Sequence, residues 1–335
     1  MIHRAGQFRL TVLNPGGRDR AHSFSEGAGS PNDSGHAPVN FHGYAASTGG
    51  VFHRETKAAV AEGLPVLLLL RGDFRATRDA LRELHRAGLT TAVSFKETGL
   101  HQIARQLSDP KRAALFHEII RDANGFLAAT PEAVIFGREG KFIPTPYPIT
   151  DSRWDFSRPL GERRGIFIGT REWDVPSRNH LTAFQLALGL DQPVTAFDEN
   201  PRRCRKLWSS LGGDDNLLRL LSKRLPYRDY LAEIAAHRLV LQADKSAVPG
   251  QVAGDALLCR LPCLGGDGAT ERLAFPRTSG FGRSLGELGE LAAKTLHDSR
   301  FYADVIAESQ QLAGERLSFE AVAPQLAEFF AALVR

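Results

Sequence analysis

Residues 239–267 contain the side chains whose types and spacing point most directly to chemistry. They predict a strand, a polar loop closed by Pro249, a helix and a second short strand. Val252, Ala256 and Cys259 recur at the spacing of one helical face. The first turn of a helix offers free backbone N–H groups and the positive end of the helix dipole to an anion. The segment therefore predicts an anion-binding loop at the carboxyl end of a strand.

Asp255 lies about one turn inside this predicted helix, which begins near Gly250. A carboxylate at such a place can accept hydrogen bonds from sugar hydroxyl groups, as an acidic residue does in dinucleotide-binding folds. The loop is therefore a candidate anion site, and Asp255 a candidate ligand for sugar hydroxyl groups.

This segment resembles the donor-sugar motif of the retaining group-1 (GT4-like) glycosyltransferases, which have the GT-B fold. Their pattern is an acidic residue, Gly-x-Gly, a short apolar helix with a second acidic residue, Cys-Gly-x-Pro-Val and a glycine turn. The matching positions here are Gly250, Val252, Ala253, Asp255, Cys259, Pro262, Gly265 and Gly266. The first acidic position departs from the pattern, because Ala247 occupies it and the nearest carboxylate is that of Asp244. The resemblance implies a nucleotide-sugar pocket with Asp255 as the ribose ligand.

The same resemblance implies ligands for the donor diphosphate. In the family, a Gly-Arg pair at a strand end and a lysine before the next helix hold this group. Gly169, Arg171 and Arg178 look like the counterparts, although Thr170 precedes the arginine and arginine replaces the lysine. Arginine suits bidentate contact with phosphate. The further candidates beside the predicted helix start are Lys245, Gly250 and Gln251. The alternative for each basic residue is a solvated surface charge.

Two glycine pairs in the first half could approach the donor. Gly49 and Gly50 precede an expected helix at 51–62 and a strand at 65–70, which is where the family places such a pair. Gly16 and Gly17 are the alternative, since glycine pairs also mark ordinary turns. We favour Gly49 and Gly50 as diphosphate ligands because of the elements that follow them.

The strand expected at 90–95 ends at Lys96 and Glu97, and in the family this strand end faces the acceptor. Glu97 could act as a general base if its pKa were raised, or it could simply stabilise the start of a helix. His42 and His53 flank the favoured glycine pair, although a single histidine is more often structural. The candidate catalytic residues are Glu97, His42 and Lys96.

Two other kinds of chemistry find little support. Residues 282–286 match G-x-S-x-G around Ser284, but no buried strand leads into them, so an α/β hydrolase is disfavoured. His36, His42 and His53 are too far apart to be read as metal ligands. We expect no metal, because Arg171, Arg178, Lys245 and helix N–H groups could offset the charge of a leaving diphosphate. No cofactor is expected other than a nucleotide-diphosphate sugar as co-substrate.

The elements that must position these residues alternate between strands and helices. In the first half, strands are expected at 8–13, 65–70, 90–95, 125–129 and 141–143, with helices at 51–62, 76–87, 100–123 and from 131. In the second half, strands are expected at 166–168, 193–197, 217–221, 238–242 and 261–264, with helices at 180–188, 201–211 and 227–236, one from 250, and a helical C-terminus from 285. Such alternation predicts parallel, doubly wound sheets.

A chain of 335 residues suits two domains. We predict an α/β protein of two Rossmann-like domains facing a cleft, with the GT-B architecture. The expected bounds are 1–148 for an acceptor domain, 149–159 for a proline-containing linker, and 160–335 for a nucleotide-sugar domain with terminal helices.

Composition narrows the setting. No apolar run approaches the roughly 20 residues that span a bilayer, and the N-terminus lacks the apolar region of a signal peptide. Three cysteines without zinc spacing suit a reducing cytoplasm, which is the expected location. The net charge of +4 is dispersed, and no nucleic-acid-binding motif is present. No nucleic-acid partner is expected, whereas peripheral contact of a basic cluster near 202–206 with a membrane stays open.

These patterns together predict a metal-independent glycosyltransferase that moves a sugar from a nucleotide-diphosphate donor to an unidentified acceptor. The alternative is a catalytically inactive GT-B-like binding or scaffold protein, which Ala247 favours and Asp255 disfavours.

Overall fold

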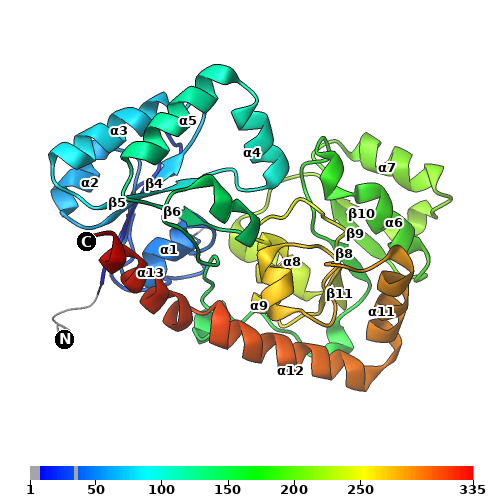
Figure 1. Ribbon diagram of the computed structural model, residues 1–335. Helices are drawn as coiled ribbons and strands as arrows, with labels where there is room; N and C mark the ends of the chain where they lie inside the picture. The colour runs from blue at the N-terminus through cyan, green and yellow to red at the C-terminus, as the bar shows by residue number, and fades with distance from the viewer. Residues whose placement is uncertain (1–7, 34–36, 335) are drawn as a thin grey trace. The chain divides into compact units, whose positions relative to one another are not determined.

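The computed structural model describes residues 8–33 and 37–334 of the chain. It contains two compact units, one formed by Met1–Thr150 together with Leu317–Arg335 and the other by Asp151–Arg316 (Figure 1). The first boundary falls inside the linker expected at 149–159. The expected second domain, however, extends to residue 335, and this is wrong for the last helix, which belongs to the first unit.

In the described part of the first unit, seven strands form one sheet in the order β2-β3-β1-β4-β5-β6-β7. Their bounds are β1 Thr11–Leu13, β2 His22–Ser23, β3 Val51–His53, β4 Val66–Leu70, β5 Thr91–Phe95, β6 Gly125–Ala128 and β7 Gly140–Phe142. All neighbours are parallel except β2 and β3. The continuous apolar run of β4 is buried at every residue, as expected for a central parallel strand covered on both faces.

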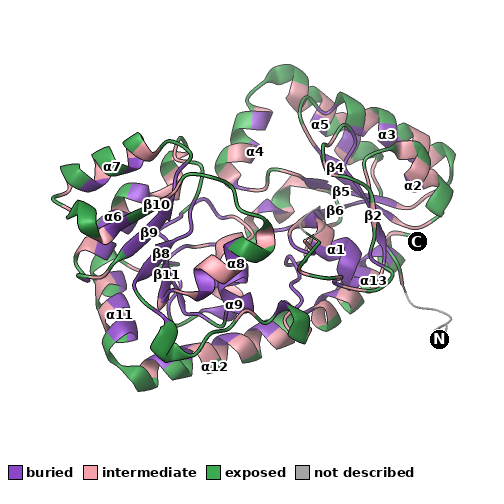
Figure 2. Ribbon diagram, turned by 180° about the vertical axis from the view of Figure 1, so that it is seen from behind, coloured by how far each residue is buried: buried purple, intermediate pink, exposed green. Residues whose placement is uncertain are grey.

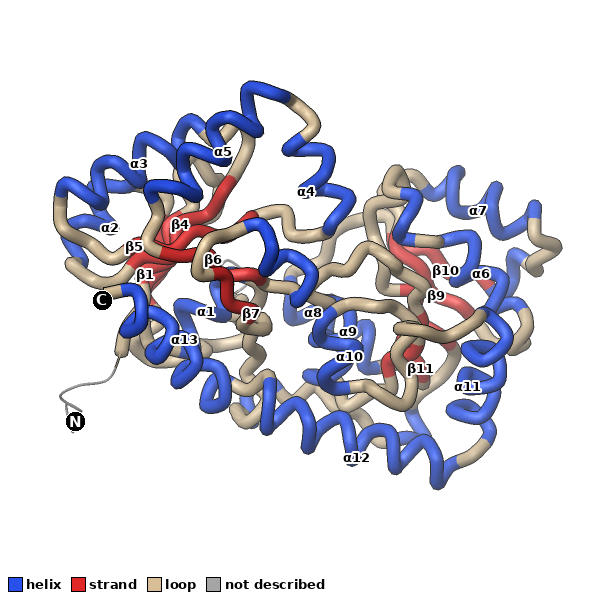
Figure 3. Tube along the Cα trace, in the orientation of Figure 1, coloured by secondary structure: helices blue, strands red, loops and turns tan. Residues whose placement is uncertain are grey.

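Helices cover both faces of this sheet (Figure 3). Their bounds are α1 Phe41–Ser47, α2 Thr56–Glu62, α3 Arg75–Arg86, α4 Leu100–Leu107, α5 Pro110–Asp122 and α13 Phe319–Leu333, with a 3-10 turn at Pro131–Phe136. Side chains of α1 and α13 pack with Leu67, Leu69 and Ala92 on one face. Those of α2, α3, α4 and α5 pack with Leu68 and Val93 on the other.

The prediction of a helix at 51–62 is wrong for the first residues of that range. Residues Val51–His53 form β3, and the helix is confined to Thr56–Glu62. Phe52 is buried in the core and pairs in register with Val12 of β1. The helix that precedes the strand, α1, was not among the helices expected from the sequence. Gly43 lets α1 lie close to the backbone at Pro146, because a Cβ on Gly43 would come within 2.7 Å of the Pro146 carbonyl oxygen.

The C-terminal helix α13 belongs to the first unit because its apolar face matches that sheet. Val322, Leu326, Phe329 and Phe330 are buried in the same cluster as α1. Just before α13 the chain is held to the first unit by a backbone hydrogen bond, which Tyr147 N–H donates to the Leu317 carbonyl at 2.8 Å. The spacing of these apolar residues predicts an amphipathic helix, but it does not predict which sheet the apolar face covers.

Ser318 caps the start of α13, and its removal should weaken the first unit. The Ser318 side chain accepts a hydrogen bond from Ala321 N–H at 3.1 Å. Ser318→Ala is expected to lower the free energy of unfolding of this unit by about 1 kcal/mol, the usual effect of losing an N-cap. Urea unfolding followed by circular dichroism measures this change. The matched variant Ser25→Ala, at an exposed loop serine of the same unit, should leave the urea midpoint unchanged.

The second unit, all of whose residues are described, contains a five-stranded parallel sheet in the order β10-β9-β8-β11-β12. The strands are β8 Ile166–Ile168, β9 Val194–Phe197, β10 Leu218–Leu221, β11 Leu239–Leu241 and β12 Cys263–Leu264. The helices are α6 His180–Leu188, α7 Pro201–Ser210, α8 Tyr227–Ala235, α9 Gln251–Leu258, α10 Ala269–Ala274, α11 Leu285–His297 and α12 Ser299–Arg316.

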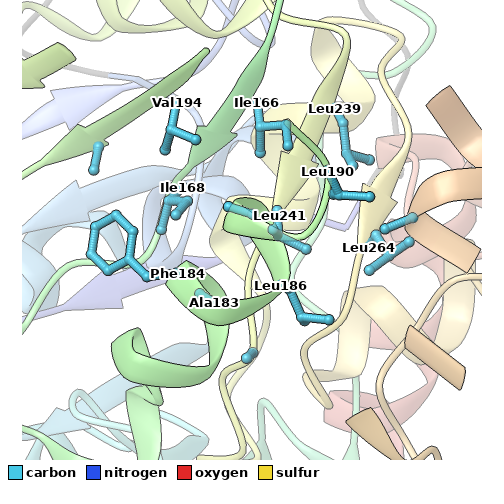
Figure 4. Packing of buried hydrophobic residues seen from close by; sticks show 14 of the residues in the cluster. Ile166, Ile168, Ala183, Phe184, Leu186, Leu190, Val194, Leu239, Leu241 and Leu264 are labelled. Atoms are coloured by element: carbon cyan, nitrogen blue, oxygen red, sulfur yellow. The ribbon is translucent and has the colours of Figure 1, made fainter. Parts of the chain in front are cut away.

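One hydrophobic cluster of the second unit lies between its sheet and the helices α6, α7 and α11. Figure 4 shows Phe184, Leu186 and Leu190 packed against Ile168 and Leu241, and Figure 2 shows the strands of this sheet as buried. No helix in the described part of the chain is both long enough and apolar enough to span a membrane.

Each sheet contains a point where the strand order reverses. In the second unit the chain runs from β8 outward to β9 and β10, then returns to β11 on the other side of β8. In the first unit β1 likewise lies between β3 and β4. The loops that leave the carboxyl ends of strands on either side of such a point diverge, and ligands of doubly wound folds bind there. The expected α/β, doubly wound class is confirmed for both sheets.

Candidate functional site

Gly169 directly follows β8 and packs against the first turn of α9, at the point where the strand order of the second sheet reverses. A Cβ on Gly169 would come within 2.5 Å of Cγ1 of Val252. Glycine therefore lets the helix start close against the strand end, as in dinucleotide-binding folds. Two segments expected to bind a diphosphate, Gly169 and the start of α9, are thus brought together.

Gly250 precedes α9 with a positive φ of 89°, in the left-handed region that favours glycine. A Cβ on Gly250 or on Gly268 would overlap Oε2 of Glu271, and one on Gly266 would come within 2.9 Å of Oε1. The carboxyl group of Glu271 therefore fills the space between three glycines, and it sets the shape of the loop in front of α9.

Glu271 itself was not among the residues expected from the sequence. Its side chain is buried, and Nε2 of Gln242 donates to Oε1 at 2.5 Å, while Oε2 has no hydrogen-bond partner in the described part of the chain. Burial raises its pKa to about 8, and the negative charges of Asp244 and Asp267 act in the same direction. The only local signal was a glutamate shortly after the Gly265 and Gly266 turn.

Asp255 is buried in α9, and the Tyr227 hydroxyl donates to its Oδ1 at 2.6 Å. Burial raises the pKa of Asp255 to about 7, against the opposing effects of the Tyr227 hydrogen bond and the Arg171 charge. Tyr227 begins α8 and was not expected from the sequence. Its hydroxyl occupies one of the carboxylate lone pairs that a ribose hydroxyl is expected to use.

Arg171 lies beside Asp255 and rests on aromatic rings. Its guanidinium carbon is 4.8 Å from the ring centroid of Phe197 and 4.6 Å from that of Tyr230. Such contacts orient a cation and stabilise it by about 0.5–1 kcal/mol at an exposed site. The loop after β8 and helix α9 thus bring together two residues that the sequence predicted for one ligand.

Arg178 has a different environment from the one expected. Its Nε donates to the Glu172 carboxylate at 3.0 Å, and its guanidinium also pairs with Asp244. The Arg178 side chain is only 14% exposed, and the carboxylates of Glu172 and Asp244 both lie against its guanidinium group. Two carboxylates therefore compensate the charge of Arg178, and a diphosphate would have to compete with them, so its role as a diphosphate ligand stays a prediction.

Lys245 is exposed on the loop after β11, and its backbone N–H donates to the Ser177 carbonyl at 2.8 Å. The hydroxyl groups of Ser177 and Ser246 are 2.7 Å apart. Arg178 and Lys245 therefore lie on two joined loops, whereas Arg171 belongs to the group around Asp255. All three follow the carboxyl ends of β8 and β11, as expected.

Ala247 occupies the position of the missing first acidic residue, with a positive φ of 46°. Its backbone N–H donates to Oδ1 of Asp267 at 3.1 Å, and Asp267 N–H donates to the Asp244 carbonyl at 2.9 Å. The carboxylate nearest to this backbone in the fold thus comes from the loop after β12.

The prediction that Gly49 and Gly50 bind the diphosphate is wrong. They precede β3, at the amino ends of the parallel strands, whereas ligands bind at the carboxyl ends. A Cβ on Gly50 would overlap the carbonyl of Leu10, and Gly50 N–H donates to the Ala45 carbonyl at 2.8 Å. The pair forms a tight turn between α1 and β3. The alternative pair, Gly16 and Gly17, follows β1 at the carboxyl edge.

The three candidate catalytic residues lie in the first unit. Nζ of Lys96 is 5.2 Å from the Phe41 ring centroid, and burial lowers its pKa. The His42 ring stacks on Phe52 at 3.9 Å, next to Phe41 at the start of α1. Glu97 is exposed. Lys96 and His42 therefore both lie around the first turn of α1, and the catalytic roles remain predictions.

The other motifs considered have structural explanations. Ser284 caps α11 in a reciprocal arrangement with Glu287, whose backbone N–H lies 3.3 Å from the serine hydroxyl. Nε2 of His53 lies 3.2 Å from Oε1 of Glu62. Residues 8–33 and 37–334 contain no group of three or more histidine, cysteine or acidic side chains placed to hold a metal ion. His36 lies outside the described residues.

No protein-family model matches the chain, and no match was found among curated proteins. Solved structures do resemble it. HepE from Anabaena, in complex with UDP and glucose, is 14% identical with a TM-score of 0.61, over 97% of this chain and 100% of that one. Sucrose-phosphate synthase from Thermosynechococcus elongatus is 14% identical with a TM-score of 0.64, over 98% and 99%.

An alpha-glucosyltransferase in complex with UDP and a 13-mer DNA containing a HMU base is 8% identical with a TM-score of 0.62, over 97% of this chain and 100% of that one. Likeness at this level of identity concerns the path of the chain, and here it extends over nearly the whole length of both proteins. The chain therefore has the GT-B fold.

Proposed function

We propose that this protein is a glycosyltransferase that takes a sugar from a nucleotide-diphosphate donor and transfers it to an acceptor without a metal ion. The donor would bind the second unit, at the carboxyl ends of β8 and β11. The motif around Asp255 favours the group-1 (GT4-like) enzymes. The UDP present in complexes of HepE and of the alpha-glucosyltransferase favours a uridine diphosphate sugar.

One observation supports this proposal most strongly. Gly169 packs against the first turn of α9, with Asp255 further along that helix and the Arg171 charge acting on it. A diphosphate at the helix start would meet N–H groups that have no intrahelical acceptor. The ribose would then lie within reach of Asp255, provided that Tyr227 yields its hydrogen bond.

Charge at this edge would assist the departure of the nucleoside diphosphate. Lys245 is exposed at the loop before α9, and Arg171 is oriented by Phe197 and Tyr230. Fixed positive groups and helix N–H groups stabilise a leaving diphosphate more than the bound substrate, and this lowers the barrier. These groups would do the work that a divalent cation does in other transferases.

At pH 8, above the raised pKa of about 7 of Asp255, Asp255→Asn is expected to weaken UDP binding by about 1–3 kcal/mol, the range for hydrogen bonds to a charged group. Isothermal titration calorimetry with UDP measures this difference. Asp229→Asn is the matched control, because Asp229 is exposed in the first turn of α8 and should leave the affinity unchanged. Equal affinities of Asp255→Asn and the unaltered protein would contradict the ribose assignment.

The proposal as a whole is tested by incubating the protein with a panel of radiolabelled nucleotide sugars. Release of the nucleoside diphosphate, by transfer or by slow hydrolysis, is the expected result. A specific observation favours the alternative of an inactive binding protein, since Ala247 provides no carboxylate and Arg178 is already paired. That alternative predicts calorimetric binding of UDP with no release from any sugar donor.

A further inference from the structure

We infer that Lys96 and Arg71 form a second anion site, on the first unit, which binds the phosphate group of a phosphorylated acceptor. That the bound phosphate belongs to an acceptor depends on the function proposed above, whereas the anion site itself depends only on the residues of the first unit.

Arg71 and Lys96 are the first residues after β4 and β5, which pair in parallel with Leu70 opposite Phe95. Extending that register by one residue places Arg71 opposite Lys96, and the Lys96 N–H indeed donates to the Leu70 carbonyl at 3.0 Å. The two basic residues are therefore neighbours across the strand ends. Each follows directly from a strand that is entirely buried.

Both side chains continue the same face of the sheet. Side chains alternate along a strand, and Leu67, Leu69 and Ala92 pack on the face covered by α1 and α13. Arg71 and Lys96 have the same parity as these residues. Lys96 confirms this placement, because its ammonium group lies over Phe41, a member of that face's cluster.

Neither cation has a close counter-charge. In the described part of the chain, no carboxylate oxygen lies within 4.0 Å of the charged nitrogens of either residue, in contrast to Arg78, Arg82 and Arg178. Arg71 donates one hydrogen bond, from Nη1 to the Gly16 carbonyl at 3.0 Å. Asp19 and Glu97 act on Lys96 only through longer-range attraction, and burial lowers its pKa.

A buried acceptor atom completes the local chemistry. Asn14 follows β1 on the same face as Val12 and is fully buried. Its amide N–H donates to Asp19 at 3.3 Å, while its Oδ1 has no partner among the described residues and could accept from a protonated phosphate or a hydroxyl group. A Cβ on Gly17 would come within 2.7 Å of the Asn14 amide carbon, so the glycine lets this loop close over the strand end.

A phosphate suits this arrangement because it satisfies both kinds of donor. Arginine presents a planar fork that matches two phosphate oxygens, and lysine adds a compact point charge. An ammonium group removed from water without a counter-ion is destabilised, and a bound phosphate anion offsets that cost. The site thus selects acceptors that carry a phosphate ester over neutral sugars.

The test uses the full chain saturated with UDP, so that the second unit cannot take up the probe, and measures binding of inorganic phosphate and of glucose 6-phosphate by calorimetry. Lys96→Met, which keeps the stem over Phe41 but removes the charge, is expected to weaken binding of both probes by about 10- to 100-fold. Arg71→Lys should have a smaller effect. Arg75→Gln, at an exposed arginine paired with Asp73, should have none.

The outcomes separate the two proposals. Equal binding of the probes by the unaltered protein and by a folded Lys96→Met variant, or no binding to either, would overturn the anion site even if UDP binds. Loss of phosphate binding in Lys96→Met, in a protein that neither binds UDP nor releases it from a donor, would support the anion site and overturn the proposed transferase. Transfer to neutral sugars as fast as to their phosphates would overturn the acceptor assignment.

Discussion

Glu271→Gln is expected to stabilise the second unit at pH 8 and above and to change its stability little near pH 5. Glutamine has the shape of a protonated glutamic acid, so it fills the space between Gly250, Gly266 and Gly268 without carrying a proton that can be lost. The difference in the free energy of unfolding between the variant and the unaltered protein should therefore grow with pH.

The sign follows from proton linkage. Burial raises the pKa of Glu271 from 4.5 to about 8, so between these values the folded state keeps a proton that the unfolded state has released. Stability contributed by this group is fully present below pH 4.5 and is lost as pH rises to about 8, at up to about 1.4 kcal/mol per pH unit. Asp255, with a pKa of about 7, acts in the same direction.

Urea unfolding at pH 5, 6.5 and 8.5 measures the effect. The control is Glu290→Gln on α11, since Glu290 is exposed and its variant should follow the unaltered protein at every pH. A pH-independent difference between Glu271→Gln and the unaltered protein would mean that Glu271 is ionised in the folded state, and that its pKa is not raised.

Gly250→Ala is expected to destabilise the second unit by about 2–5 kcal/mol and to abolish measurable UDP binding. A left-handed backbone costs an alanine about 1–2 kcal/mol. The new methyl group would also overlap the Glu271 carboxyl group, and overpacking of a buried site costs about 1–3 kcal/mol more. Because Glu271 is buried among three glycines, we expect the overlap to be relieved by a shift of the loop before α9, and that loop would hold the diphosphate.

Gly282→Ala is the matched control for this variant. Gly282 has a similar positive φ of 72°, but a Cβ there would meet nothing within 4 Å. It should therefore show the backbone cost alone and leave UDP binding intact. Equal losses of stability in the two variants would show that Glu271 moves aside freely, and retained UDP affinity in a folded Gly250→Ala protein would separate this loop from the nucleotide.

Local patterns predicted the elements that are built from short-range information. The apolar run at Val66–Leu70, the helical spacing of Arg75–Arg86 and the start of α9 at Gly250 all depend on neighbours within a turn or two. The alternation of such elements was enough to predict two doubly wound sheets. The carboxyl-edge positions of Gly169, Arg171 and Lys245 followed, because parallel strands share that edge.

Contacts between distant parts of the chain were outside the reach of these patterns. The sequence of Val51–His53 alone did not distinguish a helix from a strand, and the pairing of these residues with β1 makes them a strand. Gly49 and Gly50 therefore lie at the amino edge of the sheet. The amphipathic stripe of α13 fits any apolar sheet face, and the fold assigns it to the first unit. The hydrophobic effect is non-directional, so an apolar helix face predicts that the face is buried but not which element covers it.

The chemistry of the candidate site shows the same division. Asp255 was identifiable from its place in a helix, but its burial and its hydrogen bond from Tyr227, 28 residues away, are set by the fold. Arg178 was predictable as a cation near a strand end, but its pairing with Asp244, 66 residues away, could not be predicted from local sequence. Glu271 gave almost no local signal, since a glutamate is ordinary in sequence and becomes unusual only when three glycines and a glutamine enclose it. The desolvation and pairing that set the charge state of a side chain are properties of the assembled fold.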